Sequence, residues 1–126
     1  MIVKLDTKEK FHVITMPGSV FSTDIAANMA EILEKILASP VKNVILNLKD
    51  VPEMEEIAAE ALVKTQQKFY EQNASFVICE MQKKVEEQLD KSGLLELMNC
   101  TPSESEAWDI AQMEEIEREL LDDGPL

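Results

Sequence analysis

The segment at residues 44–62 reads VILNLKDVPEMEEIAAEAL, a strand pattern followed directly by a helix pattern. Its first five residues, VILNL, are mostly apolar and partly β-branched, which is typical of a strand at the centre of a sheet. From Glu55 to about Asn73 the apolar side chains recur at helical spacing on one face. That face consists of Ala58, Ala61, Leu62, Thr65 and Phe69. The segment therefore predicts a buried strand, a short loop and an amphipathic helix.

Upstream of this segment the chain predicts a hairpin and a helix. Residues 1–5 and 10–15 are short β-rich runs, and the polar residues 6–9 between them are typical of a hairpin connection. Residues 22–24, Ser-Thr-Asp, supply helix N-cap types, and a helical apolar pattern then runs as far as residues 39–40, Ser-Pro. The apolar positions of this helix are Ile25, Met29, Ile32, Leu33 and Ile36.

Downstream, the same alternation of strand and helix continues. Residues 75–80, SFVICE, repeat the buried-strand pattern, and a helical stretch around residues 85–89 ends at Gly93, which tolerates a positive φ. Residues 99–101 suit an edge strand. Ser103, with Glu106 three residues later, is typical of the start of a final helix.

The order of elements predicts a single α/β domain with a mixed central β-sheet of four to five strands and helices packed on it. Strands that are joined through a helix normally return parallel, whereas the first two strands form a hairpin. A chain of 126 residues has room for one domain. We assign the domain to residues 1–120 and expect residues 121–126 to form a flexible C-terminal tail.

The charge makes nucleic acid and membrane surfaces poor partners. Twenty-five acidic residues against twelve basic ones give a net charge of −13, which repels phosphate backbones and anionic lipids. The N-terminus has no apolar signal core, and no apolar run approaches the ~18 residues of a membrane-spanning helix. We therefore expect a cytoplasmic protein without direct membrane insertion.

The sequence offers little chemistry for catalysis, metals or cofactors. The single histidine, His12, has no nucleophile or carboxylate at a spacing that suggests a triad. One histidine and two cysteines, Cys79 and Cys100, do not complete a zinc site, and three glycines leave no phosphate-binding loop. We expect no metal, no cofactor and no enzyme, and we interpret the cysteines as reduced thiols.

The stretch at residues 50–60, DVPEMEEIAAE, is locally acidic and is the feature most suggestive of a binding surface. Its five acids lie between Lys49 and Lys64 without an intervening base. They can simply complement the positive N-terminus of the helix that begins there, at about 0.3 to 1 kcal/mol each. They can also form an acidic docking surface for a basic partner, and the two interpretations are compatible.

Residues 44–62 resemble the strand, loop and helix pattern of STAS domains, the family of the bacterial anti-sigma-factor antagonists. The positions that match in this stretch are Asn47, Leu48, Val51, Met54 and Leu62. Further matches are residues 76–79, Val85, Leu89, Ser92, Gly93, Leu94 and residues 103–108. The resemblance covers nearly the whole chain and implies the STAS fold.

The resemblance also implies a site at the start of the helix that follows residue 54. Where the family has D-S-[ST]-G, with a phosphorylated Ser or Thr, this chain has Glu55, Glu56, Ile57 and Ala58. Ile57 has no oxygen that could accept a phosphoryl group, so phosphorylation at this position is excluded. Ile57 either contributes to a contact surface or extends the buried stripe of its helix. The residues that we expect to contact a partner are Glu53, Glu55, Glu56, Ile57 and Glu60.

Two functions compete. The leading hypothesis is a non-catalytic protein–protein interaction module of bacterial signalling, an anti-sigma-antagonist-like protein that binds an anti-sigma factor, a kinase-like protein or another regulator. The alternative is a constitutive structural STAS subunit of a multiprotein scaffold or lipid-transport complex, with homo-oligomer formation as one arrangement.

Overall fold

The computed structural model describes residues 3–122 and shows the predicted α/β architecture. A five-stranded sheet has the order β1-β2-β3-β4-β5. β1 (Lys4–Thr7) and β2 (Phe11–Thr15) pair antiparallel, and β3 (Asn43–Asn47), β4 (Phe76–Cys79) and β5 (Cys100–Thr101) add in parallel. The prediction of a mixed sheet of four to five strands is confirmed.

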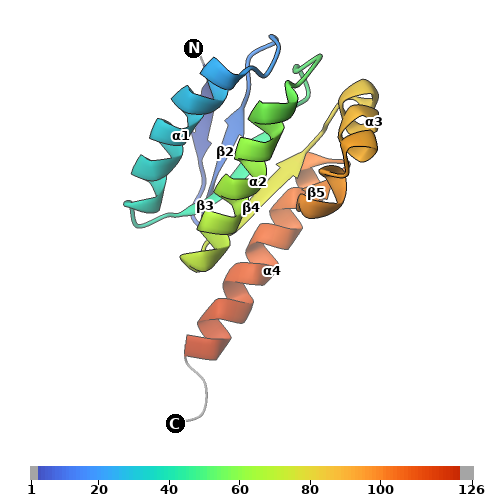
Figure 1. The fold of residues 1–126 in the computed structure, drawn as a ribbon. Helices are drawn as coiled ribbons and strands as arrows, with labels where there is room; N and C mark the ends of the chain where they lie inside the picture. The colour runs from blue at the N-terminus through green and yellow to red at the C-terminus, as the bar shows by residue number, and fades with distance from the viewer. Residues whose placement is uncertain (1–2, 123–126) are drawn as a thin grey trace.

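Helices cover both faces of the sheet (Figure 1). One face carries α1 (Thr23–Leu37), α2 (Glu56–Glu71) and α3 (Lys83–Ser92), and a short 3-10 helix, η1 (Leu95–Leu97), follows α3. The other face carries α4 (Glu104–Asp122), which packs Ala107 and Ala111 on the sheet. The strands alternate between two cores: Val44 and Leu46 face the first three helices, whereas Ile45 faces α4.

The residues predicted to begin and end helices take these positions in the structure. Ser22 is the N-cap of α1, and its hydroxyl accepts a hydrogen bond from the amide of Ile25 at 3.3 Å. Gly93 ends α3 with φ of 80°. The amide of Glu106 donates to the Ser103 hydroxyl at 3.2 Å, as expected for the start of α4. Leu121 and Asp122, assigned to the tail, belong to α4, and the rest of the predicted tail lies outside the described residues.

The first strand and the buried face of α2 differ from the sequence prediction. β1 extends through Asp6 and Thr7, because the Thr7 hydroxyl and His12 Nδ1 are hydrogen-bonded at 2.9 Å across the hairpin and polar residues suit an exposed edge strand. The turn is therefore shorter than predicted. On α2, the polar Gln66 is also buried, because its amide bonds the backbone at Leu97 and Asn99 at 3.0 and 2.7 Å.

Candidate functional site

The candidate site lies at the C-terminal ends of the four parallel strands, β2 to β5. This end of the sheet is called the edge below. Each helix from α1 to α4 begins shortly after the end of one of the strands β2 to β5. Because parallel strands end at the same edge, all four helix N-termini gather there. Helix N-termini carry partial positive charge, so this edge favours acidic side chains.

The loop at residues 48–55, between β3 and α2, is anchored to the loop that precedes α1. Met54 is fully buried and forms a β-bridge with Phe21, which is 1% exposed. The Phe21 amide donates to the carbonyl of Glu53 at 2.8 Å, and the Glu55 amide donates to the carbonyl of Phe21 at 3.0 Å. The backbone between Glu53 and Glu55 is thus held in place, with Met54 inside and the two carboxylates outside.

Two glutamines around α3 hold the same loop from the other side. Gln82 Nε2 donates to the carbonyl of Lys49 at 3.0 Å, and Gln88 Nε2 donates to the carbonyl of Met54 at 2.7 Å. These glutamines were not among the residues predicted for the site. No local pattern identifies them, because their partners lie more than thirty positions earlier in the chain.

Glu55 is bonded to a different helix from the one that its position suggests. It is the N-cap residue of α2 but makes no side-chain cap there. Its carboxylate accepts hydrogen bonds from the Thr23 amide at 2.8 Å and the Thr23 hydroxyl at 3.3 Å, at the start of α1. The interpretation that this acid complements a helix N-terminus therefore applies to α1, and Glu55 also joins the two loops.

Ile57 projects from the first turn of α2, and 66% of its surface is exposed. The alternative that it extends the buried stripe of α2 is wrong, because Ala58 and Ala59 occupy the inward positions. Glu56 and Glu60 are exposed on the same helix. Together with the exposed Glu53, all five residues predicted for partner contact lie at this edge or on the first turns of α2.

A hollow of about 310 Å³ adjoins this surface between α2 and α3. Its lining residues are Glu56, Gln88, Leu89, Lys91 and Ser92. The hollow brings Lys91 of α3 near Glu56 of α2, a neighbour that the sequence did not predict.

A second group of polar side chains ties α4 to the same edge. Glu80 has φ of 57°, and its carboxylate accepts from the amide of Glu104, the first residue of α4, at 3.1 Å. The Glu104 carboxylate accepts from Asn47 Nδ2 at 3.0 Å, and Asn47 Oδ1 accepts from the amide of Lys49 at 2.9 Å. These bonds fix the strand ends, and they leave the Asn47 amide group buried and hydrogen-bonded.

The two thiols and the histidine are placed where nucleophilic chemistry is disfavoured. Burial, and then the negative charges of Glu104 and Glu80, raise the pKa of Cys79 to about 12. Burial also raises the pKa of Cys100. Both thiols therefore remain protonated at neutral pH. His12 lies in β2, and its Nε2 is hydrogen-bonded to the carbonyl of Val41 at 2.8 Å.

Two further observations concern residues 3–122. Within this range no group of three or more His, Cys, Asp or Glu side chains is arranged to hold a metal ion. No helix among the same residues combines the length and apolar character needed to cross a lipid bilayer.

Comparison with known proteins assigns this architecture to a family. The family model described as STAS domain matches residues 3–107. No curated protein matches the sequence.

Solved structures share the fold at low sequence identity. An anti-sigma factor antagonist from Thermotoga maritima has a TM-score of 0.76 and 16% identity, with 87% of this chain and 94% of that chain covered. The unphosphorylated anti-sigma factor antagonist SpoIIAA has a TM-score of 0.69 and 18% identity, covering 88% and 96%. A sulfate transporter family protein from Wolinella succinogenes has a TM-score of 0.72 and 16% identity, covering 86% and 90%.

Proposed function

Because this chain belongs to the STAS domain family, we propose that it is a non-catalytic protein–protein interaction module of bacterial signalling, similar to an anti-sigma-factor antagonist. Its partner is a regulator such as an anti-sigma factor or a kinase-like protein. The contact surface consists of Glu53, Glu55, Glu56, Ile57 and Glu60. Solved anti-sigma factor antagonists with the same fold support this choice of partner class.

The exposure of Ile57 is the observation that carries the proposal. A large apolar side chain that is 66% exposed within an acidic surface suits an interface anchor. The loop beneath it is held by bonds to both α3 and the segment before α1, so the anchor is presented on a rigid support. The surrounding carboxylates favour a partner with basic groups around an apolar recess.

Binding at this surface is independent of phosphorylation at residue 57. Isoleucine has no hydroxyl group, so a partner kinase cannot modify it. Glu55 and Glu56 imitate a phosphate only in part, because a phosphate carries about 1.5 to 2 negative charges on three clustered oxygens. Glu55 is moreover engaged with Thr23, so it contributes to the shape of the surface more than to free charge.

The non-catalytic assignment has physical support. The raised pKa values of Cys79 and Cys100 disfavour a thiolate nucleophile. The imidazole of His12 is occupied on both nitrogens, by Thr7 and by the Val41 carbonyl. Neither the two thiols nor the imidazole is therefore available as a general base at the candidate site.

The test is affinity capture of the partner from cells of the native organism, followed by binding measurements with purified proteins. The variant combines Glu53→Lys, Glu56→Lys and Ile57→Ser, and it leaves Glu55 intact because Glu55 also bonds α1. We expect the variant to bind the captured regulator at least about tenfold more weakly, because it loses the anchor and reverses two charges.

The control variant combines Glu31→Lys, Glu71→Lys and Leu97→Ser, which makes the same chemical changes at exposed positions away from the surface. It should bind as the unmodified protein does. Equal affinity of both variants for the regulator would remove the proposed surface, since both carry the same net charge.

The exposed Ile57 also supports the second candidate, a constitutive structural subunit of a multiprotein scaffold or lipid-transport complex. An apolar contact without a covalent switch suits permanent assembly. Light scattering after size-exclusion chromatography over a range of concentrations separates the two functions. A stable homo-oligomer favours the scaffold subunit, and a monomer favours the transient signalling module.

A further inference from the structure

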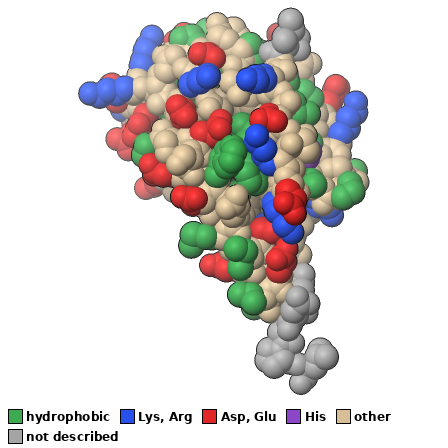
Figure 2. All heavy atoms as spheres, turned by 180° about the vertical axis from the view of Figure 1, so that it is seen from behind, with side chains coloured by type: hydrophobic (Ala, Val, Ile, Leu, Met, Phe, Trp, Pro, Cys, Tyr) green, Lys and Arg blue, Asp and Glu red, His purple; other side chains and the backbone are tan. Residues whose placement is uncertain are grey.

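The C-terminal half of α4 carries an exposed apolar stripe on the face of the molecule opposite α1 to α3. Met113, Ile116 and Leu120 are 60, 55 and 67% exposed. Their spacing of three and four residues places them on one side of the helix. Figure 2 shows hydrophobic side chains along the tapering end of this face, with acidic side chains beside them. A surface helix in water normally keeps such a stripe against a core.

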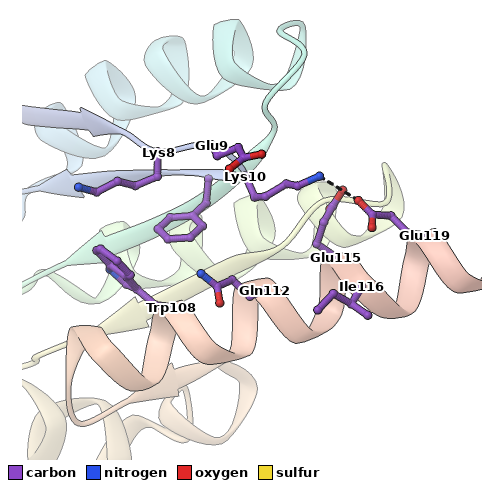
Figure 3. Close-up of a pocket in the computed structure, with 9 residues that line it drawn as sticks. Lys8, Glu9, Lys10, Trp108, Gln112, Glu115, Ile116 and Glu119 are labelled. Carbon is purple, nitrogen blue, oxygen red and sulfur yellow. Dashed lines mark hydrogen bonds and ion pairs between the residues drawn. The ribbon is translucent and has the colours of Figure 1, made fainter.

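The stripe continues into a hollow between α4 and the β1–β2 turn (Figure 3). This hollow has a volume of about 310 Å³ and includes Ile116 of the stripe. Phe11 and Trp108 form its aromatic end, with ring centroids 5.2 Å apart in an edge-to-face arrangement. Stripe and hollow share Ile116 and together form the groove. From Met113 to Leu120 the stripe spans about 10 Å, which is about two turns of a helix.

The charges around the groove are predominantly negative. Lys10 is paired with Glu119 at 3.0 Å, and Lys8 is paired with Asp6 at 3.0 Å. Glu117 flanks the stripe on one side, and Glu119, paired with Lys10, flanks it on the other. Residues 104–122 contain eight acidic residues and one basic residue, Arg118. Arg118 is itself bonded to Glu115 at 3.0 Å. The lysines at the rim therefore leave little positive charge to attract an anionic ligand.

We propose that this groove on α4 binds an amphipathic helix of a protein partner, with apolar side chains on the stripe and Lys or Arg side chains opposite the flanking carboxylates. The charge pattern selects this occupant. A second copy of α4 would place two acidic helices side by side, and an anionic membrane would meet the same repulsion. A basic amphipathic helix can cover the apolar stripe with its apolar face and pair its Lys or Arg side chains with the flanking carboxylates.

This groove is separate from the surface around Ile57. Ile57 lies on α2, on one face of the sheet, whereas the groove lies on α4, on the other face. The match to the STAS domain model ends at residue 107, so the stripe belongs to a part of α4 outside the matched residues. The protein could therefore hold two partners at once.

The single tryptophan makes the proposal directly testable, because Trp108 lines the hollow. The probe is an 18-residue synthetic peptide of Leu and Lys, with Leu on one helical face and no aromatic residue. Titration at about 0.15 M salt limits unspecific attraction between opposite charges. We expect a saturable shift of the Trp108 emission, and a Kd at least tenfold higher in the variant that combines Ile116→Ser and Leu120→Ser.

Three controls, one protein variant and two peptides, test whether binding is specific to the groove. The variant with Leu5→Ser and Leu97→Ser, two residues that are 50 and 53% exposed elsewhere, should keep the unmodified Kd. A Leu/Glu peptide, and a Leu/Lys peptide with its leucines scattered around the helix, should bind much more weakly. Equal Kd values in the two double variants, an unchanged Trp108 emission, or equal binding of the Leu/Glu peptide would each overturn the proposal. So would a homodimer that the Ile116 and Leu120 substitutions dissociate, since a second copy would then be the occupant.

Discussion

Tyr70 illustrates how the fold changes the chemistry of a single side chain. Its hydroxyl donates to the Glu114 carboxylate at 2.8 Å and accepts from Asn99 Nδ2 at 2.6 Å. Burial, and then the hydrogen bond and negative charge of Glu114, raise the pKa of Tyr70 to about 12. The phenol thus links α2, the segment before β5 and α4, and this link requires the protonated form.

Spectrophotometric titration can test this prediction without interference, because Tyr70 is the only tyrosine. We expect its absorbance change at a pH near 12 in the folded protein and near 10 in concentrated urea, where the usual pKa returns. The raised pKa adds stability that is complete below pH ~10 and is lost as the pH rises toward 12. A folded-state midpoint near 10 would contradict the described environment of the phenol.

At the scale of single elements, the start of α1 depends on side chains from two parts of the chain. Ser22 supplies the local N-cap, and Glu55 adds a second acceptor from the loop before α2. Both satisfy amide groups that have no partner inside the helix. The first turn of α1 and the loop below Ile57 are therefore coupled.

Replacement of Glu55 by Ala should lower the free energy of unfolding by about 1 kcal/mol, as loss of a helix cap does. Urea denaturation measures this change. Glu53→Ala is the matched control, because Glu53 is an exposed acid in the same loop; we expect its effect to stay within about 0.5 kcal/mol. Equal effects of the two substitutions would mean that the bond from Thr23 to Glu55 adds nothing to stability.

At the scale of the whole molecule, a partly buried cluster of polar side chains connects α4 to the sheet. Arg118 Nη2 donates to Asn43 Oδ1 at 2.9 Å, to Ser75 Oγ at 3.0 Å and to Glu115 Oε2 at 3.0 Å. Asn43 Nδ2 donates to Glu115 as well, at 3.0 Å. The hydrogen bond from Asn43 and the charge of Arg118 lower the pKa of Glu115, although its partial burial opposes the shift.

The lowered pKa predicts a pH-dependent stability. The contribution of Glu115 is present above its unfolded pKa of ~4.3 and is lost as the pH falls through the lower folded value. Glu115→Gln should therefore reduce the free energy of unfolding by about 0.5 to 1 kcal/mol at pH 7 and by much less at pH 3. Denaturation at both pH values measures the difference, with Glu117→Gln as the exposed control on the same helix. A pH-independent loss would show that the ionised form of Glu115 is not what stabilises α4.

The order of strands and helices was determined by the sequence alone. The run VILNL predicted a buried strand, Ser22 and Ser103 marked helix starts, and Gly93 marked a helix end. These signals are local, because periodicity, capping and a positive φ depend on residues within about one helical turn. The motif around residue 57 likewise led to the prediction of a contact surface there, with Ile57 at the position of the family's hydroxyl residue. That surface stays a prediction.

Only the tertiary structure decided which residues of these strands and helices contact each other and which are exposed. The exposure of Ile57, the bond from Thr23 to Glu55, and the glutamines that hold Met54 all join segments that are distant in sequence. The same holds for the stripe on α4, since only the folded chain shows that Met113, Ile116 and Leu120 are exposed among residues 3–122. A sequence pattern states which side chains are apolar or charged, but the path of the whole chain determines which of them are left uncovered and what stands beside them.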